Sequence, residues 1–435
     1  MEEHVTAVLG MPGFELIAAD LVDGEWELLV QTRRDLVGCP ACGAVAVVKG
    51  RRAVRVRDLP IGGVPVVVVW RKRSYSCRHL LCENKSWTET SDLIAPRSAL
   101  TERARRWAFD QVAHHDRAVA TVAAELGVGW HTVMREVRRR GIPLIQDPVR
   151  VAAVTGVGVD ETAFLKATGT HSTVYVTGIT DLTPGRPARL LDVVQGRSGT
   201  VLGGWLGERD QTWRDQIHTA SLDPFRGYAT ALATHLPDAV RVLDPFHVVK
   251  LGLTCVDDVR RRVQQETTGH RGRVDDPLYR RRRLLRRRHD RLTDTAKAKL
   301  SAALDAGDPD GEVTAAWWIA QQLMAAYHHP HPSTGKLIIT RTIQAAKDCP
   351  VPEVKRLART LNAWRTELLA RFDHPGVSNG PTENVNLKVK NTKRVARGYR
   401  NFDNYRLRLL LNHGSINNNR HYANPIRDRR PTIMT

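Results

Sequence analysis

The sequence predicts a multidomain chain of α+β and α/β class: a cysteine-rich β module, a short helical module, and an α/β core with a large all-helical insertion. Three changes of pattern along the 435 residues predict this order. Two close cysteine pairs flank a strand-like stretch near the N-terminus, and apolar residues take a helical period after residue 98. From residue 151 strands and helices follow one another, until a long helical stretch interrupts them.

The charge balance limits the classes of partner. The chain has 66 Lys and Arg against 46 Asp and Glu, a net charge of +20. Such a surplus favours a polyanionic partner, most often nucleic acid, with an anionic membrane surface as the other option. No apolar run approaches the ~20 residues that span a bilayer, and the N-terminus lacks a signal pattern. We therefore expect a cytoplasmic, nucleoid-associated protein with no membrane partner.

Residues 1–92 are predicted to form a zinc ribbon. The stretch 52–77 alternates, turns at Gly62-Gly63 and alternates again, as a β-hairpin does, and one cysteine pair lies on each side of it. Four thiolates suit one tetrahedral, structural Zn²⁺. The second pair is separated by four residues rather than two, and His79 could replace one sulfur. The alternative is a set of ordinary buried cysteines. The predicted ligands are Cys39, Cys42, Cys77 and Cys82.

Residues 93–149 are predicted to form a helix-turn-helix DNA-binding domain. A first helix covers about 99–115, and the next stretch indicates helix, a turn at Gly127, and a second helix ending at Gly141. On that second helix His131, Arg135 and Arg138 share one face, as on a recognition helix. The alternative is an ordinary helical hairpin with a solvated basic face. Residues 142–150 contain two prolines and are predicted to be a linker.

The α/β core is predicted over residues 150–249 and 376–420. Its elements follow the order β-β-β-α-β-α-β, which is the order of the ribonuclease H-like fold. The first, fourth and fifth strands are predicted to end at Asp160, Asp223 and Asp244. The last two lie in copies of one tetrapeptide, Leu-Asp-Pro-Phe. Because strand one pairs with strand four in this fold, Asp223 is expected beside Asp160, and Asp244 one strand further out.

These acids suit metal-dependent phosphodiester chemistry. Two Mg²⁺ (or Mn²⁺) ions held by carboxylates can activate water and stabilise the leaving oxygen. A third acid is expected in the first turn of a helix after strand five, and Glu383 fits, with Lys390 and Arg394 on the same face to meet phosphates. The alternative role for Glu383 is helix capping. Since the two tetrapeptides are alike, the roles of Asp223 and Asp244 could be exchanged.

Residues 250–375 are predicted to be an all-helical insertion. Residues 250–299 contain sixteen Lys and Arg against seven Asp and Glu, and the arginines of 280–288 are expected to coat most of one helix. A uniformly basic helix repels itself unless phosphates neutralise it. Trp317 and Trp318 are assigned to the core. Residues 421–435 are expected to be disordered. The predicted DNA contacts of the insertion are Arg281, Arg282, Arg286 and Arg287.

The motifs together resemble the ISL3 family of insertion-sequence transposases. The resemblance runs from about Cys39 to Asn412 and is carried by "CPACG", "GVDET", "DPFHVVKL" and "TENVNLKVKNTKRVARGYRNF". It implies a DDE transposase whose acidic triad is Asp160, Asp223 and Glu383. It also implies that Asp244 and His247, an Asp-x-x-His motif, support the site or contact DNA.

The function expected is therefore that of a transposase. It would bind the terminal inverted repeats of an insertion sequence, cleave DNA strands there and join them to target DNA. Because two ends must be held together, we expect a homodimer or a larger assembly. The alternatives are a transposase-derived regulator without catalysis, which the intact acids oppose, and a structure-selective nuclease on the same fold.

Overall fold

The computed structural model describes residues 10–33, 36–170 and 172–415. The chain packs as two compact units, one of residues up to 150 together with 390–415, the other of residues 151–389. Residues 421–435, predicted to be disordered, lie outside the described residues. The sequence assigned 376–420 to the catalytic domain, whereas residues 390–415 pack with the N-terminal unit.

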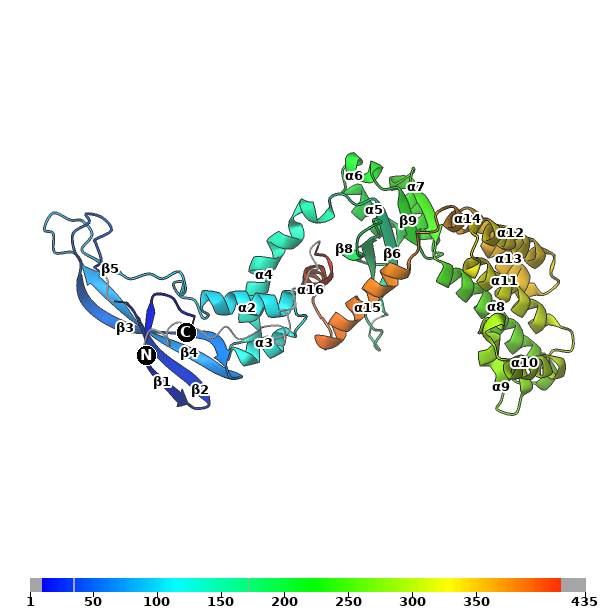
Figure 1. The fold of residues 1–435 in the computed structure, drawn as a ribbon, viewed down its shortest axis with the longest axis horizontal. Coiled ribbons are helices and arrows are strands. Elements are labelled where there is room, and N and C mark those ends of the chain that lie inside the picture. Colours follow the sequence, from blue (N-terminus) through cyan, green and yellow to red (C-terminus); the bar gives the residue numbers. More distant parts are fainter. Residues whose placement is uncertain (1–9, 34–35, 171, 416–435) are drawn as a thin grey trace, which may run out of the picture. The chain divides into compact units, whose positions relative to one another are not determined.

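The N-terminal unit begins with a five-stranded sheet (Figure 1). The strand order is β1-β2-β4-β3, with β5 paired to β4. The predicted hairpin turn is confirmed: Gly62 and Gly63 have φ of 61° and 82°, which a two-residue type I′ turn requires. Trp70 and its neighbours form the apolar core of the sheet. The strands are β1 (Phe14–Val22), β2 (Glu25–Thr32), β3 (Val47–Ile61), β4 (Val64–Ser76) and β5 (Ser86–Thr88).

Four helices complete this unit: α2 (Glu102–Ala113), α3 (Val119–Glu125), α4 (Trp130–Gln146) and α16 (Phe402–His413). The turn at Gly127 is confirmed, with φ of 63°. The prediction that Gly141 ends the second helix is wrong, because α4 continues to Gln146. A Cβ at Gly141 would lie 2.8 Å from Leu411 Cδ1. This glycine therefore permits close packing of α16 on α4 and does not end the helix.

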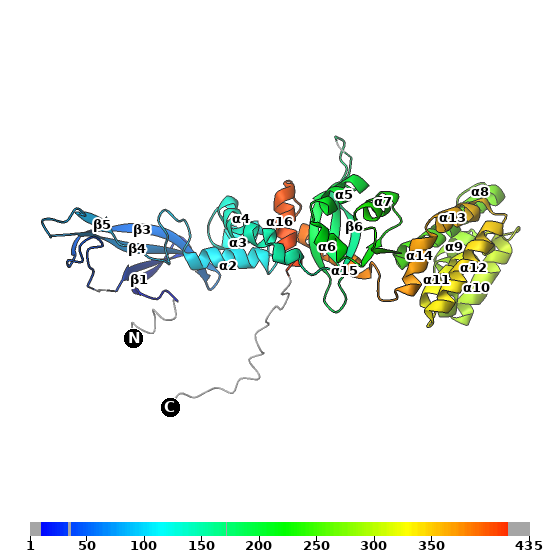
Figure 2. The same cartoon turned by 90° about the horizontal axis from the view of Figure 1, so that it is seen from above.

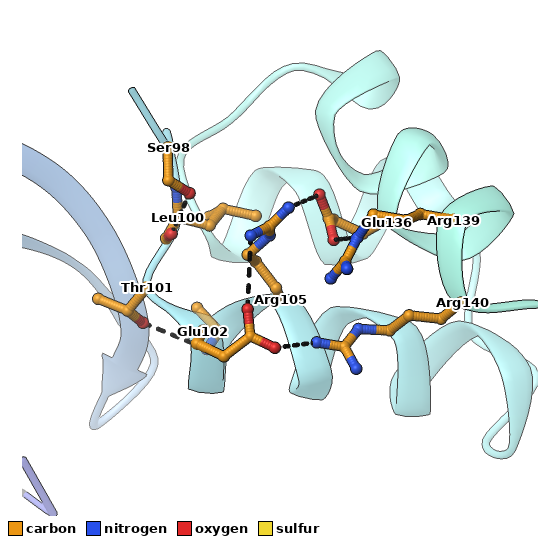
Figure 3. A network of polar contacts seen from close by, with 9 residues as sticks. Ser98, Leu100, Thr101, Glu102, Arg105, Glu136, Arg139 and Arg140 are labelled. Atoms are coloured by element: carbon orange, nitrogen blue, oxygen red, sulfur yellow. Dashed lines mark hydrogen bonds and ion pairs between the residues drawn. The ribbon is translucent and has the colours of Figure 1, made fainter. Parts of the chain in front are cut away.

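An ion-pair network fixes α4 against α2 (Figure 3). The buried carboxylate of Glu136 accepts hydrogen bonds from Arg105 at 2.9 Å and Arg139 at 3.0 Å. Arg140 reaches across to Glu102, which also pairs with Arg105. Burial raises the pKa of Glu136, but the two arginines outweigh it and hold that pKa below its usual value. The network sets the angle at which the outer face of α4 is presented.

The second unit contains a five-stranded sheet in the order β10-β9-β6-β7-β8. β6 pairs antiparallel with β7, and β7 with β8, while β6, β9 and β10 are parallel. The predicted pairing of strands one and four is thus confirmed. One detail differs, since the first strand continues five residues past Asp160 to Leu165, paired there with β7 alone. The strands are β6 (Gly156–Leu165), β7 (Val174–Asp181), β8 (Arg189–Gln195), β9 (Thr219–Leu222) and β10 (Val240–Leu243).

Three helices, α5 (Gly199–Gly207), α6 (Gln211–Asp215) and α7 (Arg226–His235), lie between the strands in the chain. After β10 the chain is helical: α8 to α14 gather into a bundle, whereas α15 lies beside the sheet (Figure 2). The sheet and bundle share one apolar core, in which Trp317 is buried, while Trp318 remains 45% exposed. The helices are α8 (Pro245–Thr268), α9 (Pro277–Leu285), α10 (Asp294–Gly307), α11 (Glu312–His328), α12 (Pro332–Asp348), α13 (Pro352–Ala363), α14 (Arg365–Asp373) and α15 (Gly380–Val395).

Among the described residues, no helix combines the length and the apolar character that crossing a bilayer requires.

Candidate active site

Three aspartates lie at one level across three neighbouring strands. Val159 of β6 and Leu243 of β10 are both register partners of Leu222 in β9. The residue that follows each of these three is an aspartate. Asp160 follows Val159, Asp223 follows Leu222, and Asp244 follows Leu243. Carboxylates thus gather at the carboxyl edge of the parallel strands, where open α/β sheets usually hold their ligands.

The two Leu-Asp-Pro-Phe copies differ in where the next helix begins. α8 begins inside the second copy: Pro245 is its first residue and Asp244 is its N-cap, with a carboxylate that accepts from the His247 backbone N–H at 3.4 Å. After the first copy, α7 begins only at Arg226, so Asp223 caps no helix. The carboxylate of Asp223 is therefore left available to the site.

Asp160 and Asp223 repel each other electrostatically. Burial and the nearby charge of Asp223 raise the pKa of Asp160 to about 6. Its carboxylate accepts from the Glu161 backbone N–H at 2.6 Å and from the amide of Asn386. Such crowding of negative charge is relieved by a cation, and oxygen donors of this kind suit Mg²⁺. The donor set at this edge therefore fits a divalent metal ion.

His247 lies between the two aspartates of the doubled tetrapeptide. Its Nδ1 is 3.0 Å from an oxygen of Asp223 and 3.0 Å from an oxygen of Asp244. Burial lowers the pKa of His247, but hydrogen bonds to the two carboxylates outweigh it and raise that pKa to about 10. The Nδ1 atom of His247 is therefore within hydrogen-bonding distance of both acids.

The start of α15 is seated on β6. A Cβ at Gly158 would overlap Thr382 Oγ1 and lie 3.0 Å from Asn379 Oδ1, so only glycine admits the segment here. The Asn379 side chain donates to Asp223 Oδ1 at 3.3 Å, and its backbone N–H donates to Asp244 Oδ1 at 3.3 Å. Asn379 thereby ties together the ends of two strands.

One helical turn after Thr382, Asn386 donates to Asp160 and accepts from Thr162 Oγ1 at 3.4 Å. Both asparagines are almost completely buried. They were not assigned a role from the sequence, although both lie in or beside the quoted "TEN" segment. Asn379 immediately precedes α15 and Asn386 lies seven residues later, and this spacing of about two helical turns would have been the signal to follow.

Glu383 lies in the first turn of α15, half-buried, between Thr382 and the turn that carries Asn386. Among described residues, the acidic cluster tight enough to hold an ion as it stands is Asp223, Asp244 and His247, with ligand atoms within 4.8 Å of one another. Asp160 and Glu383 are not part of it. The structure thus brings Asp160 beside Asp223. It also places the start of α15, which carries Glu383, against β6, the strand that carries Asp160.

The four predicted zinc ligands converge. Their sulfur atoms lie within 4.8 Å of one another, at 3.7 Å for Cys39–Cys82 and 3.6 Å for Cys42–Cys77. Tetrahedral Zn²⁺ with bonds of about 2.3 Å separates its sulfurs by about 3.8 Å, so the cluster has the right size. His79 is exposed and is not in the cluster, so the alternative of a histidine ligand is not supported.

The predicted recognition face is exposed. His131, Arg135 and Arg138 project from α4 away from the buried Val133 and Val137. Arg138 donates through Nε at 3.0 Å and Nη2 at 2.8 Å to Asn404 Oδ1. This contact holds the guanidinium and leaves three of its five N–H bonds for another partner. Lys390 and Arg394 are exposed on α15.

The arginine run of the insertion is not one helix. α9 ends at Leu285, so Arg286 and Arg287 lie in the following turn, both exposed, whereas Arg281 and Arg282 are half-buried on the helix. Arg286 pairs with Asp257 at 2.6 Å. Splitting the run between a helix and a turn reduces the self-repulsion that a single basic helix would have.

Comparisons with known proteins agree on one family. The profile described as "Transposase", the DDE domain of the ISL3 family, matches residues 157–409. The profile "zinc-finger of transposase IS204/IS1001/IS1096/IS1165" matches residues 35–82, and "Helix-turn-helix domain of transposase family ISL3" matches residues 89–141.

The individual proteins that this chain resembles are also described as transposases. The chain is 27% identical over 380 residues to the transposase for insertion sequence element IS1001 of Bordetella parapertussis, covering 85% of this chain and 87% of that protein. It is 27% identical over 293 residues to the transposase for IS1557 of Mycobacterium tuberculosis, 63% of each chain. A solved Drosophila P element transposase strand transfer complex aligns with 71% of this chain and 91% of that chain, at 11% identity and a TM-score of 0.40.

Proposed function

The chain belongs to the ISL3 family of transposases, whose catalytic profile covers more than half of it, and we propose that it cuts and joins DNA at the terminal inverted repeats of its own insertion sequence. As a DDE transposase it is a DNA-cleaving enzyme with a zinc ribbon and a helix-turn-helix domain. The observation that carries the finer proposal is the crowding of Asp160 and Asp223 at one sheet edge, beneath the start of α15.

We assign the metal-binding triad to Asp160, Asp223 and Glu383. Two Mg²⁺ ions held there would supply an activated water and stabilise the leaving oxygen. Asp244 already caps α8 and accepts from Asn379 and His247, so both of its oxygens have protein donors. That supports a positioning role for Asp244. Asn386 and Asn379 orient Asp160 and Asp223 by donating to them.

The recognition of DNA is assigned to the N-terminal unit. His131, Arg135 and Arg138 would reach base edges from α4, while Lys390, Arg394 and the arginines of the insertion would meet phosphates. Holding two element ends at once requires at least a dimer, and work on chromosomal DNA would place the protein with the nucleoid.

The test uses a labelled duplex that carries the inverted repeat flanking the gene, beside a scrambled duplex of equal length and composition. With Mg²⁺ we expect cleavage at the repeat end, a free 3′-hydroxyl, and joining to a target plasmid, all abolished by chelation and by Asp160→Asn or Glu383→Gln. Equal cleavage of the scrambled duplex would instead identify a nuclease without repeat specificity. Selective binding with no cleavage by the wild-type protein would identify a regulator.

A further inference from the structure

A cleft of about 600 Å³ opens in the N-terminal unit beside the first turns of α4. One wall is formed by the starts of α3 and α4, and the other by the turn that precedes α16 and the first turns of that helix. The two walls come from segments more than 250 residues apart in the chain. The size lies within the ~300–1,000 Å³ that ligand sites commonly have.

The lining of the cleft is positively charged. It includes Arg138, Arg400 and Arg408 and no carboxylate. Arg408 is buried and pairs with Asp116 at 3.1 Å, so its charge is compensated. Arg138 contacts only the neutral amide of Asn404 among the polar contacts described. Arg400 is exposed, and no acidic partner for it occurs in the described part of the chain. The cleft therefore keeps the charge of two arginines and suits an anion.

An exposed indole adds an apolar surface. Trp130 is the first residue of α4 and lines the cleft, with 39% of its surface exposed. Its ring contacts the edge of the His131 ring at 5.1 Å between centroids. Because Gly129 precedes it as a bare N-cap, no side chain of the preceding residue covers the indole. A flat apolar ring beside uncompensated arginines matches a nucleotide, which has an apolar sugar and base edge next to a phosphate.

We propose that this cleft binds one nucleotide of the DNA backbone beside the bases that α4 reads. The phosphate lies against Arg400, and the deoxyribose and base edge pack on the indole of Trp130. The assignment rests on the proposed function, because it assumes that the exposed face of α4 enters DNA. The segment before α16 then becomes a second DNA-contacting element of the recognition domain. A free nucleotide shares this chemistry, but the opening beside the start of the recognition helix favours DNA.

The test compares binding of the full-length protein to the terminal-repeat duplex and to the scrambled duplex across a salt series. Arg400→Ala should lower the slope of log K against log salt by about one on both duplexes, since a phosphate contact is independent of sequence. Trp130→Leu should weaken binding about tenfold at fixed salt, and Trp130→Phe should retain most of the affinity. Arg106→Ala is the matched control, because it removes an exposed arginine of α2 that does not line the cleft. It should bind more tightly than Arg400→Ala.

Several outcomes would overturn the assignment. If folded Arg400→Ala and folded Trp130→Leu both bound DNA as tightly as Arg106→Ala does, the cleft would not hold DNA. Saturable binding of deoxyadenosine monophosphate that leaves DNA affinity unchanged would assign the cleft to a soluble nucleotide. A wild-type protein that fails to distinguish the two duplexes would refute end recognition. Even then, the effect of Arg400→Ala on binding to the scrambled duplex would show whether the cleft contacts DNA.

Discussion

The doubled tetrapeptide allows a test with two variants, in which Asp244→Asn should lose mainly stability and Asp223→Asn should lose mainly activity. In Asp244→Asn, the buried carboxylate that accepts from Asn379 at 3.3 Å and from the His247 ring at 3.0 Å becomes an amide. The amide keeps one acceptor and turns an NH₂ group toward the other donor. Losing one hydrogen bond to a charged acceptor costs about 1.5–3 kcal/mol. At roughly 2–4 °C per kcal/mol for a domain of this size, Tm should fall by about 3–12 °C.

Asp223→Asn should behave in the opposite way. The side chain of Asp223 is 19% exposed and caps no helix. Its contacts with Asn379 and His247 both use Oδ1, which asparagine keeps, so the structural loss should be about 1 kcal/mol. If Asp223 holds metal, however, the variant loses several kcal/mol of transition-state stabilisation. At about 1.4 kcal/mol per factor of ten, cleavage should slow at least 10³-fold while binding to the terminal repeat survives.

The assay is cleavage of the labelled terminal-repeat duplex, at a temperature well below the Tm of the less stable variant, with binding and thermal unfolding measured in parallel. We expect Asp244→Asn to cleave within about tenfold of the wild type, because its loss acts through positioning. A folded but inactive Asp244→Asn beside an active Asp223→Asn would show that the second tetrapeptide, not the first, carries the metal ligand.

Three further outcomes are expected. Metal analysis of the full-length protein should return about one zinc per chain, and Cys39→Ser should remove it and lower the stability of the N-terminal unit; a stable, zinc-free protein would contradict this. Arg135→Ala and Arg138→Ala should reduce discrimination between the repeat and scrambled duplexes, while changes in the insertion should weaken binding to both and flatten the salt dependence. The insertion residues to change are Arg281, Arg282, Arg286 and Arg287. If these changes abolished discrimination and the α4 changes only weakened binding, the roles of α4 and the insertion would be reversed. Because the pKa of Glu136 is depressed in the fold, its contribution to stability is present above about pH 4.5 and is lost as the pH falls through the lower folded value. Glu136→Gln should lower the free energy of unfolding by about 1–3 kcal/mol at pH 7, and its stability should fall less steeply than that of the wild type below pH 4.5. If the stability of the variant and of the wild type depended on pH in the same way, the role of the Glu136 network would be contradicted.

Features set by short-range pattern could be predicted from the sequence. The zinc hairpin and the helix-turn-helix each follow from residues close together in the chain, such as the Gly62-Gly63 turn. The strand order follows from the succession of elements, which is that of the ribonuclease H-like fold. The extent of α4 could not be predicted in this way. Gly141 has the sequence signature of a helix end, but its partner Leu411 lies 270 residues away and makes it a packing position. Local signals therefore failed where a distant segment decides the geometry.

The candidate site depends on the same kind of long-range packing. Asp160 and Asp223 can be placed from strand order, whereas the donors that orient them, Asn379 and Asn386, come from a segment about 220 residues beyond β6. No periodicity near Asp160 indicates that this segment returns to lie on the strand. The residue that allows the start of α15 to pack against β6 is Gly158, two positions before Asp160 on the same face of the strand.

Replacement of Gly158 by alanine is therefore the most direct test of how the site is assembled. The new methyl group would overlap Thr382 Oγ1, lie 2.8 Å from Leu182 Cδ1 and lie 3.0 Å from Asn379 Oδ1. Overpacking of this kind costs about 1–3 kcal/mol and moves the start of α15, which carries Glu383. Cleavage should fall far more than terminal-repeat binding, because the N-terminal unit keeps its own core. Gly156→Ala is the comparison: it also crowds β6, 2.8 Å from Thr219 Oγ1, but away from α15. If both variants lost the same stability and the same activity, the seating of α15 on Gly158 would have no special part in forming the site.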